Sequence, residues 1–331
     1  LEFRRVLFRS KNKIATSPWR ATYHVEPDTG LLNDPNGFSY FDGKWIVFYQ
    51  NFPFGATHGL KSWVQLESDD LVHFTETGVR VLPDTPLDSH GAYSGSAMQF
   101  DDKLFLFYTG NVRDENWVRH PYQIGALLNK DGHIQKLNKV LIEQPKDTTD
   151  HFRDPQIFNY KGQSYAIVGG QTLDKKGFIK FYKAVENDYI NWEEVGDLDF
   201  ENDNTAYMME CPNLVFIDET PILLYCPQGL SKKVAPYDNI FPNMYKIGQS
   251  FDIAETAIVD PSPPQNLDYG FDCYATQAFN APDGRVLAVS WLGLPDIAYP
   301  SDRFDHQGIL SLVKELTLKK GKLYQYPVQA I

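Results

Sequence analysis

The chain has 331 residues, 42% of them hydrophobic, so it can bury one large core or two smaller ones. Its formal net charge of -12 argues against nucleic acid or an anionic membrane surface as a partner, although one local basic pocket for a phosphate group remains open. Tyr, Phe and Trp make up 14% of the residues and recur in short alternating runs, which favours an all-β protein that binds a small molecule.

The N-terminal stretch, residues 1–10, matches nothing that follows, so we interpret it as a cloning-derived segment and expect the natural N-terminus to be missing. No stretch of the sequence has the length of a membrane span or the order of a secretory signal. The cysteines Cys211, Cys226 and Cys273 are odd in number, lack metal-ligand spacing and lie in apolar settings. Buried free thiols are typical of a reducing compartment, so we expect a cytoplasmic location.

A polar motif, Asn33-Asp34-Pro35-Asn36-Gly37, precedes a strand-like run, the turn Asp42-Gly43 and the apolar strand 44–49. Pro35 biases Asp34 toward an extended conformation, and Asn36-Gly37 is a strong tight-turn pair. We therefore expect a turn that holds the Asp34 carboxylate on a rigid corner. A plain surface Asp-Pro turn is the alternative interpretation of this motif.

The same order of motif, short strand, turn and strand recurs along the chain. Starts at residues 34, 93, 154, 210 and 272 give intervals of 59, 61, 56 and 62 residues. The later turns are Asp101-Asp102, Lys161-Gly162, Asp218-Glu219 and Asp283-Gly284. This repetition predicts a five-bladed β-propeller over residues 11–318, and a β-sandwich with coincidental spacing is the alternative.

Three of the repeat starts carry a carboxylate beside a proline or a cysteine-proline pair, namely Asp34, Asp154 and Glu210. Because the innermost strand of every blade lines the axis of a propeller, these side chains should meet in one pocket. Two carboxyl groups that flank a bond are the usual apparatus of glycoside cleavage. We expect Asp34 to be the nucleophile, and Glu210 to be the general acid and then the base.

For Glu210, the preceding Met208 and Met209 suggest apolar surroundings that would raise the pKa of its carboxyl group. Asp154 is then left to hold sugar hydroxyls and to stabilise positive charge on the ring, with Arg153 as a fork-shaped donor. A local salt bridge between Arg153 and Asp154 is the alternative.

A sugar pocket also needs flat aromatic faces and amide or hydroxyl partners. The candidates are Asn33, Gln50, Trp63, Tyr93, Ser94, Tyr274 and Trp291, and for each aromatic residue a core position is the alternative. The histidines show no paired spacing, and no glycine-rich loop typical of a nucleotide site is present. We expect neither a metal nor a cofactor.

Four ordered motifs, at residues 33–37, 93–97, 152–155 and 210–212, resemble those of the β-fructofuranosidases of glycoside hydrolase family 32. The resemblance implies a five-bladed propeller that cleaves a β-fructofuranosidic bond with retention, through a covalent fructosyl-enzyme intermediate. It also implies that Asp34 is the nucleophile, Asp154 the transition-state stabiliser and Glu210 the acid/base.

Within this family, residues 48–63 and 226–230 are most similar to the bacterial sucrose-6-phosphate hydrolases, which are cytoplasmic. Sucrose 6-phosphate or sucrose is therefore the expected substrate, and a non-catalytic fructoside-binding propeller or a fructosyltransferase are the alternatives. Lys61, Lys232 and Lys233 are candidates to bind the phosphate, and solvated surface lysines are the alternative for each.

Family members usually carry a C-terminal β-sandwich after the propeller. By this resemblance, residues 319–331 are the expected start of a linker to a sandwich that is missing. An apolar face of the propeller would then be open, which predicts low stability or self-association.

Overall fold

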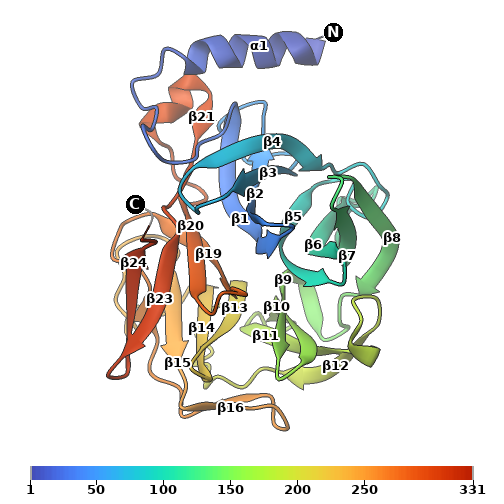
Figure 1. Ribbon diagram of the computed structural model, residues 1–331, viewed down its shortest axis with the longest axis vertical. Coiled ribbons are helices and arrows are strands. Elements are labelled where there is room, and N and C mark those ends of the chain that lie inside the picture. The colour runs from blue at the N-terminus through green and yellow to red at the C-terminus, as the bar shows by residue number, and fades with distance from the viewer. Residues whose placement is uncertain (1, 330–331) are drawn as a thin grey trace.

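The computed structural model describes residues 2–329, which form five large β-sheets around a central axis (Figure 1). The innermost strands are β1 (Gly30–Phe41), β5 (Ala92–Phe100), β9 (Thr148–Tyr160), β13 (Met208–Ile217) and β19 (Cys273–Asn280). Each contacts the next in this order, and β19 contacts β1. The ring of sheets is closed, so the predicted β-propeller is confirmed and the β-sandwich alternative is wrong.

The remaining strands build each blade outward from the axis. The first blade adds β2 (Lys44–Phe52), β3 (Ser62–Ser68) and β4 (Phe74–Val81), and the second adds β6 (Lys103–Arg113), β7 (Arg119–Asn129) and β8 (Ile134–Ile142). The third adds β10 (Gln163–Thr172), β11 (Gly177–Ala184), the 3₁₀ turn η1 (Val185–Asn187) and β12 (Trp192–Asp197). The fourth adds β14 (Thr220–Gln228), β15 (Met244–Ile247) and β18 (Gln265–Asn266), with the separate hairpin β16 (Ser250–Asp252) and β17 (Ala257–Val259). The fifth adds β20 (Val286–Leu292), β22 (Ile309–Leu310), β23 (Lys314–Lys319) and β24 (Lys322–Pro327).

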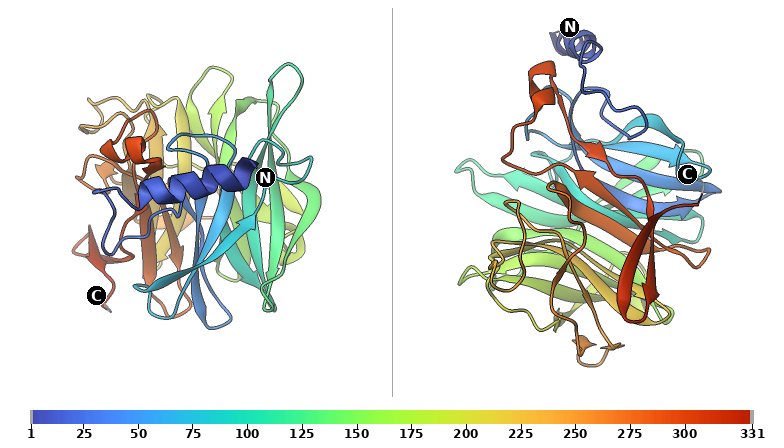
Figure 2. Two further views of the ribbon diagram at one scale, coloured as in Figure 1. Left: turned by 90° about the horizontal axis from the view of Figure 1, so that it is seen from above. Right: turned by 90° about the vertical axis from the view of Figure 1, so that its left-hand side faces the viewer.

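The N-terminal helix α1 (Glu2–Ile14) lies outside the propeller (Figure 2). It runs without a break across residue 10, where the sequence suggested a boundary. Lys13 pairs with Asp305 at 2.8 Å, just after the 3₁₀ helix η2 (Pro300–Phe304), and the following β21 (His306–Gln307) pairs with β1 in parallel. Within residues 2–329, no helix has the length and apolar character that crossing a membrane requires.

The predicted hairpin turns between the first and second strands of the blades are confirmed. Asp42 and Gly43 have φ angles of 49° and 79°, and Lys161 and Gly162 have 51° and 83°. Two successive left-handed residues match the twist of a tight antiparallel hairpin. The second strands that follow are almost wholly buried, as in β2, so their apolar runs fill the space between neighbouring sheets.

The tight turn expected at Asn36-Gly37 is wrong, because both residues lie inside the 12-residue strand β1. The pairing of β1 with β2 shifts twice, between Leu32 and Pro35 and again between Asn36 and Ser39. Gly37 has a φ of 57°, and a Cβ atom there would lie 2.7 Å from the Phe48 ring. The turn residues therefore form β-bulges, which bend the strand without reversing it.

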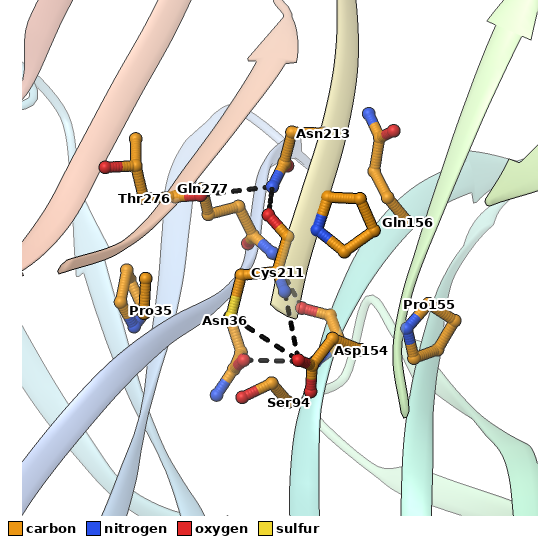
Figure 3. A pocket seen from close by; sticks show the side chains of 13 residues that line it. Pro35, Asn36, Ser94, Asp154, Pro155, Gln156, Cys211, Asn213, Thr276 and Gln277 are labelled. Atoms are coloured by element: carbon orange, nitrogen blue, oxygen red, sulfur yellow. Dashed lines mark hydrogen bonds between the residues drawn. The ribbon is translucent and has the colours of Figure 1, made fainter. Parts of the chain in front are cut away.

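One buried polar side chain on each innermost strand bonds to the backbone of a neighbouring innermost strand. Figure 3 shows four of these side chains, Asn36, Gln156, Asn213 and Gln277. Gln156 is typical: its amide donates to the carbonyl of Leu214 at 3.1 Å and accepts from the Leu214 nitrogen at 2.8 Å. Gln277 closes the ring by accepting from the Phe38 nitrogen at 2.6 Å. These bonds join sheets that share no backbone ladder. The set is Asn36, Ser96, Gln156, Asn213 and Gln277.

This ring sets the true correspondence between blades. The residues two positions before these polar side chains are Asp34, Ser94, Asp154, Cys211 and Ala275. The residues three positions before them are Asn33, Tyr93, Arg153, Glu210 and Tyr274. The expected equivalence of Glu210 with Asp34 and Asp154 is therefore wrong by one residue. Each innermost strand has a β-bulge next to these positions, and a bulge aims successive side chains toward the same side.

Candidate active site

A cavity of about 450 Å³ opens where the innermost strands present these bulged residues. It is lined by the carboxylates Asp34, Asp154 and Glu210 together. Of the other predicted pocket residues, all except Trp63 line it, namely Asn33, Gln50, Tyr93, Ser94, Arg153, Tyr274 and Trp291. Residues from every blade therefore contribute to one site.

The Asp34 carboxylate is held by a closed set of hydrogen bonds. Asn33 Nδ2 donates to Asp34 Oδ1 at 3.2 Å and to Gln50 Oε1 at 2.7 Å. Gln50 Nε2 donates to Ser94 Oγ at 2.7 Å, and Ser94 Oγ donates to Asp34 Oδ2. Burial raises the pKa of Asp34, and the Ser94 hydrogen bond opposes that rise. The carboxylate is thus fixed in orientation but costly to ionise.

Lys61 is buried, lines the same cavity and donates from Nζ to Asn33 Oδ1 at 2.7 Å. Burial lowers the pKa of Lys61 to about 7, and the Asp34 carboxylate opposes that change. Its neighbour His58 has a pKa lowered to about 3 by burial and by the Lys61 charge, so the imidazole is neutral near pH 7. Lys61 therefore contacts the Asp34 side of the cavity through Asn33.

The apolar environment expected around Glu210 is wrong. Arg153 donates to Glu210 Oε1 from Nε at 3.0 Å and from Nη2 at 2.6 Å. Gln228 Nε2 donates to Oε2 at 2.8 Å and the Tyr274 hydroxyl at 2.5 Å. Met208 and Met209 are buried in the core, but the carboxylate between them and Cys211 points to polar partners in the cavity.

The local Arg153–Asp154 salt bridge is also wrong, because Arg153 reaches across to the next blade. Its remaining terminal nitrogen, Nη1, donates to His151 Nδ1 at 2.8 Å. Although burial opposes the charge on Arg153, the Glu210 carboxylate raises the pKa of its guanidinium overall. Arg153 therefore orients Glu210 and leaves Asp154 to other partners.

Asp154 lies beside Cys211 (Figure 3) and interacts with the charges of both other carboxylates. Its Oδ2 accepts from the Cys211 nitrogen at 3.0 Å, and the Cys211 thiol lies 3.6 Å from that oxygen and 3.8 Å from Asp34 Oδ2. Burial raises the pKa of Asp154 to about 7, with Arg153 opposing and the Glu210 and Asp34 charges adding to the rise. Three acidic groups thus compete for negative charge in one buried site.

Trp63 does not line the cavity, which corrects its predicted role. Its side chain is 0% exposed and packs 5.4 Å from the Phe48 ring and 5.5 Å from the Tyr108 ring, between the first two blades. Its Nε1 donates to the Tyr93 carbonyl at 3.0 Å. Trp63 therefore belongs to the core, which was the alternative interpretation, and it stabilises the backbone of the pocket residue Tyr93.

Several lining residues were missed from the sequence, including His58, Arg119, His151, Tyr207, Gln228, Phe241 and Asp296. For Gln228 a signal existed: it ends the apolar run of β14 as Gln50 ends that of β2. Arg119 and His151 lie where strands begin after loops, and no local pattern marks them. Lys232 and Lys233 are exposed and outside the cavity lining, so neither is placed to meet a ligand there.

The described residues hold no group of three or more His, Cys, Asp or Glu side chains that could bind a metal ion. The cavity offers the chemistry of carboxylates. Asp34 is held by Asn33 and Ser94, and Glu210 is held by the Arg153 guanidinium. Such a pair can attack a carbon centre and move a proton to or from an oxygen.

Comparison with known proteins places this cavity in context. Residues 24–327 match the family model described as glycosyl hydrolases family 32 N-terminal domain. The chain is 71% identical over 321 residues to a sucrose-6-phosphate hydrolase of Streptococcus mutans, covering 97% of this chain and 67% of that protein. It is 55% identical to the sucrose-6-phosphate hydrolase of Lactococcus lactis, covering 95% of this chain and 67% of that protein.

Two solved structures share the fold. The sucrose-6-phosphate hydrolase from Lactobacillus gasseri is 49% identical with a TM-score of 0.96, over 99% of this chain and 67% of that one. A Bombyx mori family 32 β-fructofuranosidase mutant in complex with sucrose is 30% identical with a TM-score of 0.88, over 100% of this chain and 69% of that one. This chain spans about two thirds of the length of these relatives.

Proposed function

This chain belongs to the glycosyl hydrolases of family 32, and on that premise we propose that it hydrolyses the β-fructofuranosidic bond of sucrose 6-phosphate and of sucrose. The observation that carries the proposal is the shared cavity of Asp34 and Glu210, each fixed by its own hydrogen bonds. The relatives named as sucrose-6-phosphate hydrolases support the choice of substrate.

In the first step, an Asp34 oxygen attacks the anomeric carbon of the fructosyl unit while the bond from that carbon to the glycosidic oxygen breaks. Glu210 gives its proton to the departing oxygen, which leaves as a sugar hydroxyl. Both Glu210 oxygens accept hydrogen bonds in the structure, so a protonated Glu210 requires one donor, such as Tyr274, to turn toward the substrate.

In the second step, water attacks the fructosyl-Asp34 ester at the same carbon. Glu210, now a carboxylate, takes the proton of that water, and the carbon–oxygen bond to Asp34 breaks to restore the nucleophile. The Arg153 fork and Gln228 fit this half of the cycle, since both donate to the ionised form of Glu210.

Asp154 does not attack or transfer a proton in this scheme. Buried beside Asp34, it supplies negative charge where the fructosyl ring becomes positive in the transition state. The burial that makes Asp154 costly to ionise also strengthens its attraction for the positive ring, because little water is present to screen the charge.

The test is direct: incubate the chain with sucrose 6-phosphate and with sucrose, and measure the fructose released. Asp34→Asn serves as the control and should keep its melting temperature while losing turnover. Binding of a fructoside by parent and variant with no product from either would favour the non-catalytic alternative. Products larger than the substrate at high sucrose would favour the transferase.

We also propose a cytoplasmic location. Cys211, Cys226 and Cys273 are all free and buried, as expected of a protein that never meets an oxidising compartment. Fractionation of cells that produce the protein should recover it with the cytoplasmic enzymes, and recovery from the medium would contradict the proposal.

Self-association is a further proposal, in which a second copy covers the outer edge of the fifth blade. The strand β24 forms that edge and exposes Tyr324 and Tyr326, and an unpaired strand edge is a template for pairing. Sedimentation at several concentrations should show a dimer that Tyr326→Lys weakens. A monomer at every concentration would contradict it.

A further inference from the structure

Arg119, the first residue of β7, is a cation of the cavity lining with no side-chain hydrogen-bond or ion-pair partner among the described residues. Its Nε atom is buried, and no hydrogen bond or ion pair of its guanidinium occurs within residues 2–329. The chain carries 43 acidic residues against 31 lysines and arginines, so a guanidinium left without a carboxylate is against the trend. A buried donor without a partner costs free energy unless a ligand satisfies it.

Two other arginines, Arg113 and Arg153, lie near Arg119. Arg119 stands directly opposite Arg113 in the pairing of β6 with β7, and like charges at facing positions destabilise a sheet. Arg113 is occupied elsewhere, donating from Nη1 to the Trp117 carbonyl at 3.0 Å. Burial lowers the pKa of Arg119; Tyr93 and Asp150 oppose this change, and the Arg153 and Arg113 charges add to it.

His151 adds a donor next to this charge. Arg153 Nη1 can only donate, so His151 Nδ1 accepts and the neutral ring carries its proton on Nε2. That nitrogen has no hydrogen-bond partner among the described residues, and His151 lines the same cavity. By contrast, the acidic Asp296 lines the cavity near Tyr207, so the lining has a basic part and an acidic part.

The basic part lies on the side of the leaving group. Glu210, which gives its proton to the departing oxygen, is bound by Arg153, and Arg153 in turn contacts His151. Lys61 is on the other side, tied through Asn33 to the nucleophile that receives the fructosyl unit. A charged substituent of the departing sugar would find Arg119 on this side, whereas Lys61, which lines the same cavity, is engaged with Asn33.

We propose that Arg119, assisted by the Nε2–H of His151, binds the phosphate group of the departing sugar and selects sucrose 6-phosphate over sucrose. The proposal rests on the function proposed above. The planar guanidinium matches two oxygens of a phosphate, whose double negative charge also relieves the repulsion between Arg119 and Arg113. Plain sucrose has no charge to place there, so Arg119 should matter little for it.

The experiment compares kcat/KM for sucrose 6-phosphate and for sucrose in the parent chain, Arg119→Gln and Arg119→Lys. Arg119→Gln should lose about 10- to 100-fold on sucrose 6-phosphate, mainly through KM, and change less than about 2-fold on sucrose. Arg119→Lys should recover part of the loss, because the charge returns without the fork. The matched control is Arg303→Gln, an exposed arginine outside the cavity, which should act like the parent on both substrates.

Equal losses on both substrates would show a structural role and overturn the proposal, as would an unchanged preference for the phosphorylated sugar. If the parent cleaves neither substrate, the proposed function has failed, and calorimetry with glucose 6-phosphate still tests the subsite. Binding by the parent that Arg119→Gln weakens at least about 10-fold would support it. Equal binding by both would overturn it.

Discussion

Arg153 and Glu210 are 57 residues apart in the sequence, yet Arg153 Nη2 lies 2.6 Å from Glu210 Oε1. A second bond from Arg153 Nε to the same oxygen, at 3.0 Å, anchors that oxygen, and Gln228 and Tyr274 hold the other. This pair joins the third and fourth blades at Glu210, the residue proposed to give and take the proton. The orientation of Glu210 therefore depends on Arg153, which the sequence suggested as a partner of Asp154.

Arg153→Lys keeps the charge but removes the fork, so Glu210 should lose its fixed orientation. We expect kcat to fall about 10- to 100-fold with a smaller change in KM, measured on sucrose. Arg285→Lys is the matched control, because Arg285 makes the same kind of fork with Asp283 on an exposed turn. Similar losses in the two variants would argue against an orienting role.

Ser94→Ala removes the hydroxyl that donates to Asp34 and accepts from Gln50. Since the Ser94 hydrogen bond opposes the rise in the pKa of Asp34, its loss should raise that pKa further. The acidic limb of the kcat/KM profile should move to higher pH, and kcat should fall about 10-fold or more at neutral pH. Ser231→Ala, at a position outside the cavity lining, should leave the profile in place.

Asp154→Asn should separate stability from activity. The pKa of Asp154 is raised from 3.8 to about 7 by burial, so the folded state holds its proton more tightly than the unfolded state. The associated stability is fully present below about pH 3.8 and is lost as pH rises through about 7. The variant should therefore melt above the parent at pH 8, with a smaller difference at pH 4, while its turnover is low.

A gap between variant and parent that stays constant from pH 4 to pH 8 would contradict this account of Asp154. Asp252→Asn offers a control, because Asp252 is an exposed aspartate on the outer hairpin β16. Its melting curve should follow that of the parent at both pH values.

Gln156→Ala should destabilise the propeller by about 2 kcal/mol or more, because the backbone nitrogen and carbonyl of Leu214 lose their partners in a buried position. Chemical denaturation measures the free energy of unfolding. Gln99→Ala, at an exposed outer position of β5, should change it by less than about 0.5 kcal/mol. Equal effects would mean that the ring of polar side chains does not hold the blades.

Much of the fold could be predicted because each blade is built from local signals. A turn such as Asp42-Gly43 or Lys161-Gly162 between two apolar runs produces a hairpin by itself, and the repetition of these hairpins indicated a propeller. Asn36-Gly37 carries the same turn signal but forms a bulge, because β2 pairs along the whole of β1 and holds it extended. Tertiary pairing outweighed local preference there.

The site was predicted less evenly. The meeting of Asp34, Asp154 and Glu210 in one cavity could be predicted because a carboxylate beside a proline recurs with the blades. The predicted alignment of Glu210 with the other two was wrong by one residue. Trp63 was misplaced because an aromatic residue next to a pocket motif has the same sequence pattern whether it faces the pocket or the core. Arg119 and His151 were missed because nothing local distinguishes them from other polar residues near loops.

By itself, the sequence determined the strands, the hairpin turns, the number of blades and the three carboxylates, since each depends on residues close together in the chain. Only the tertiary structure decided that Arg153 binds Glu210, that Lys61 supports Asp34 through Asn33, and that the Arg119 guanidinium has no hydrogen-bond partner in the described part of the chain. These facts depend on which side chains of different blades meet around the axis. These contacts form only when the ring of blades closes, so the sequence of one blade does not predict them.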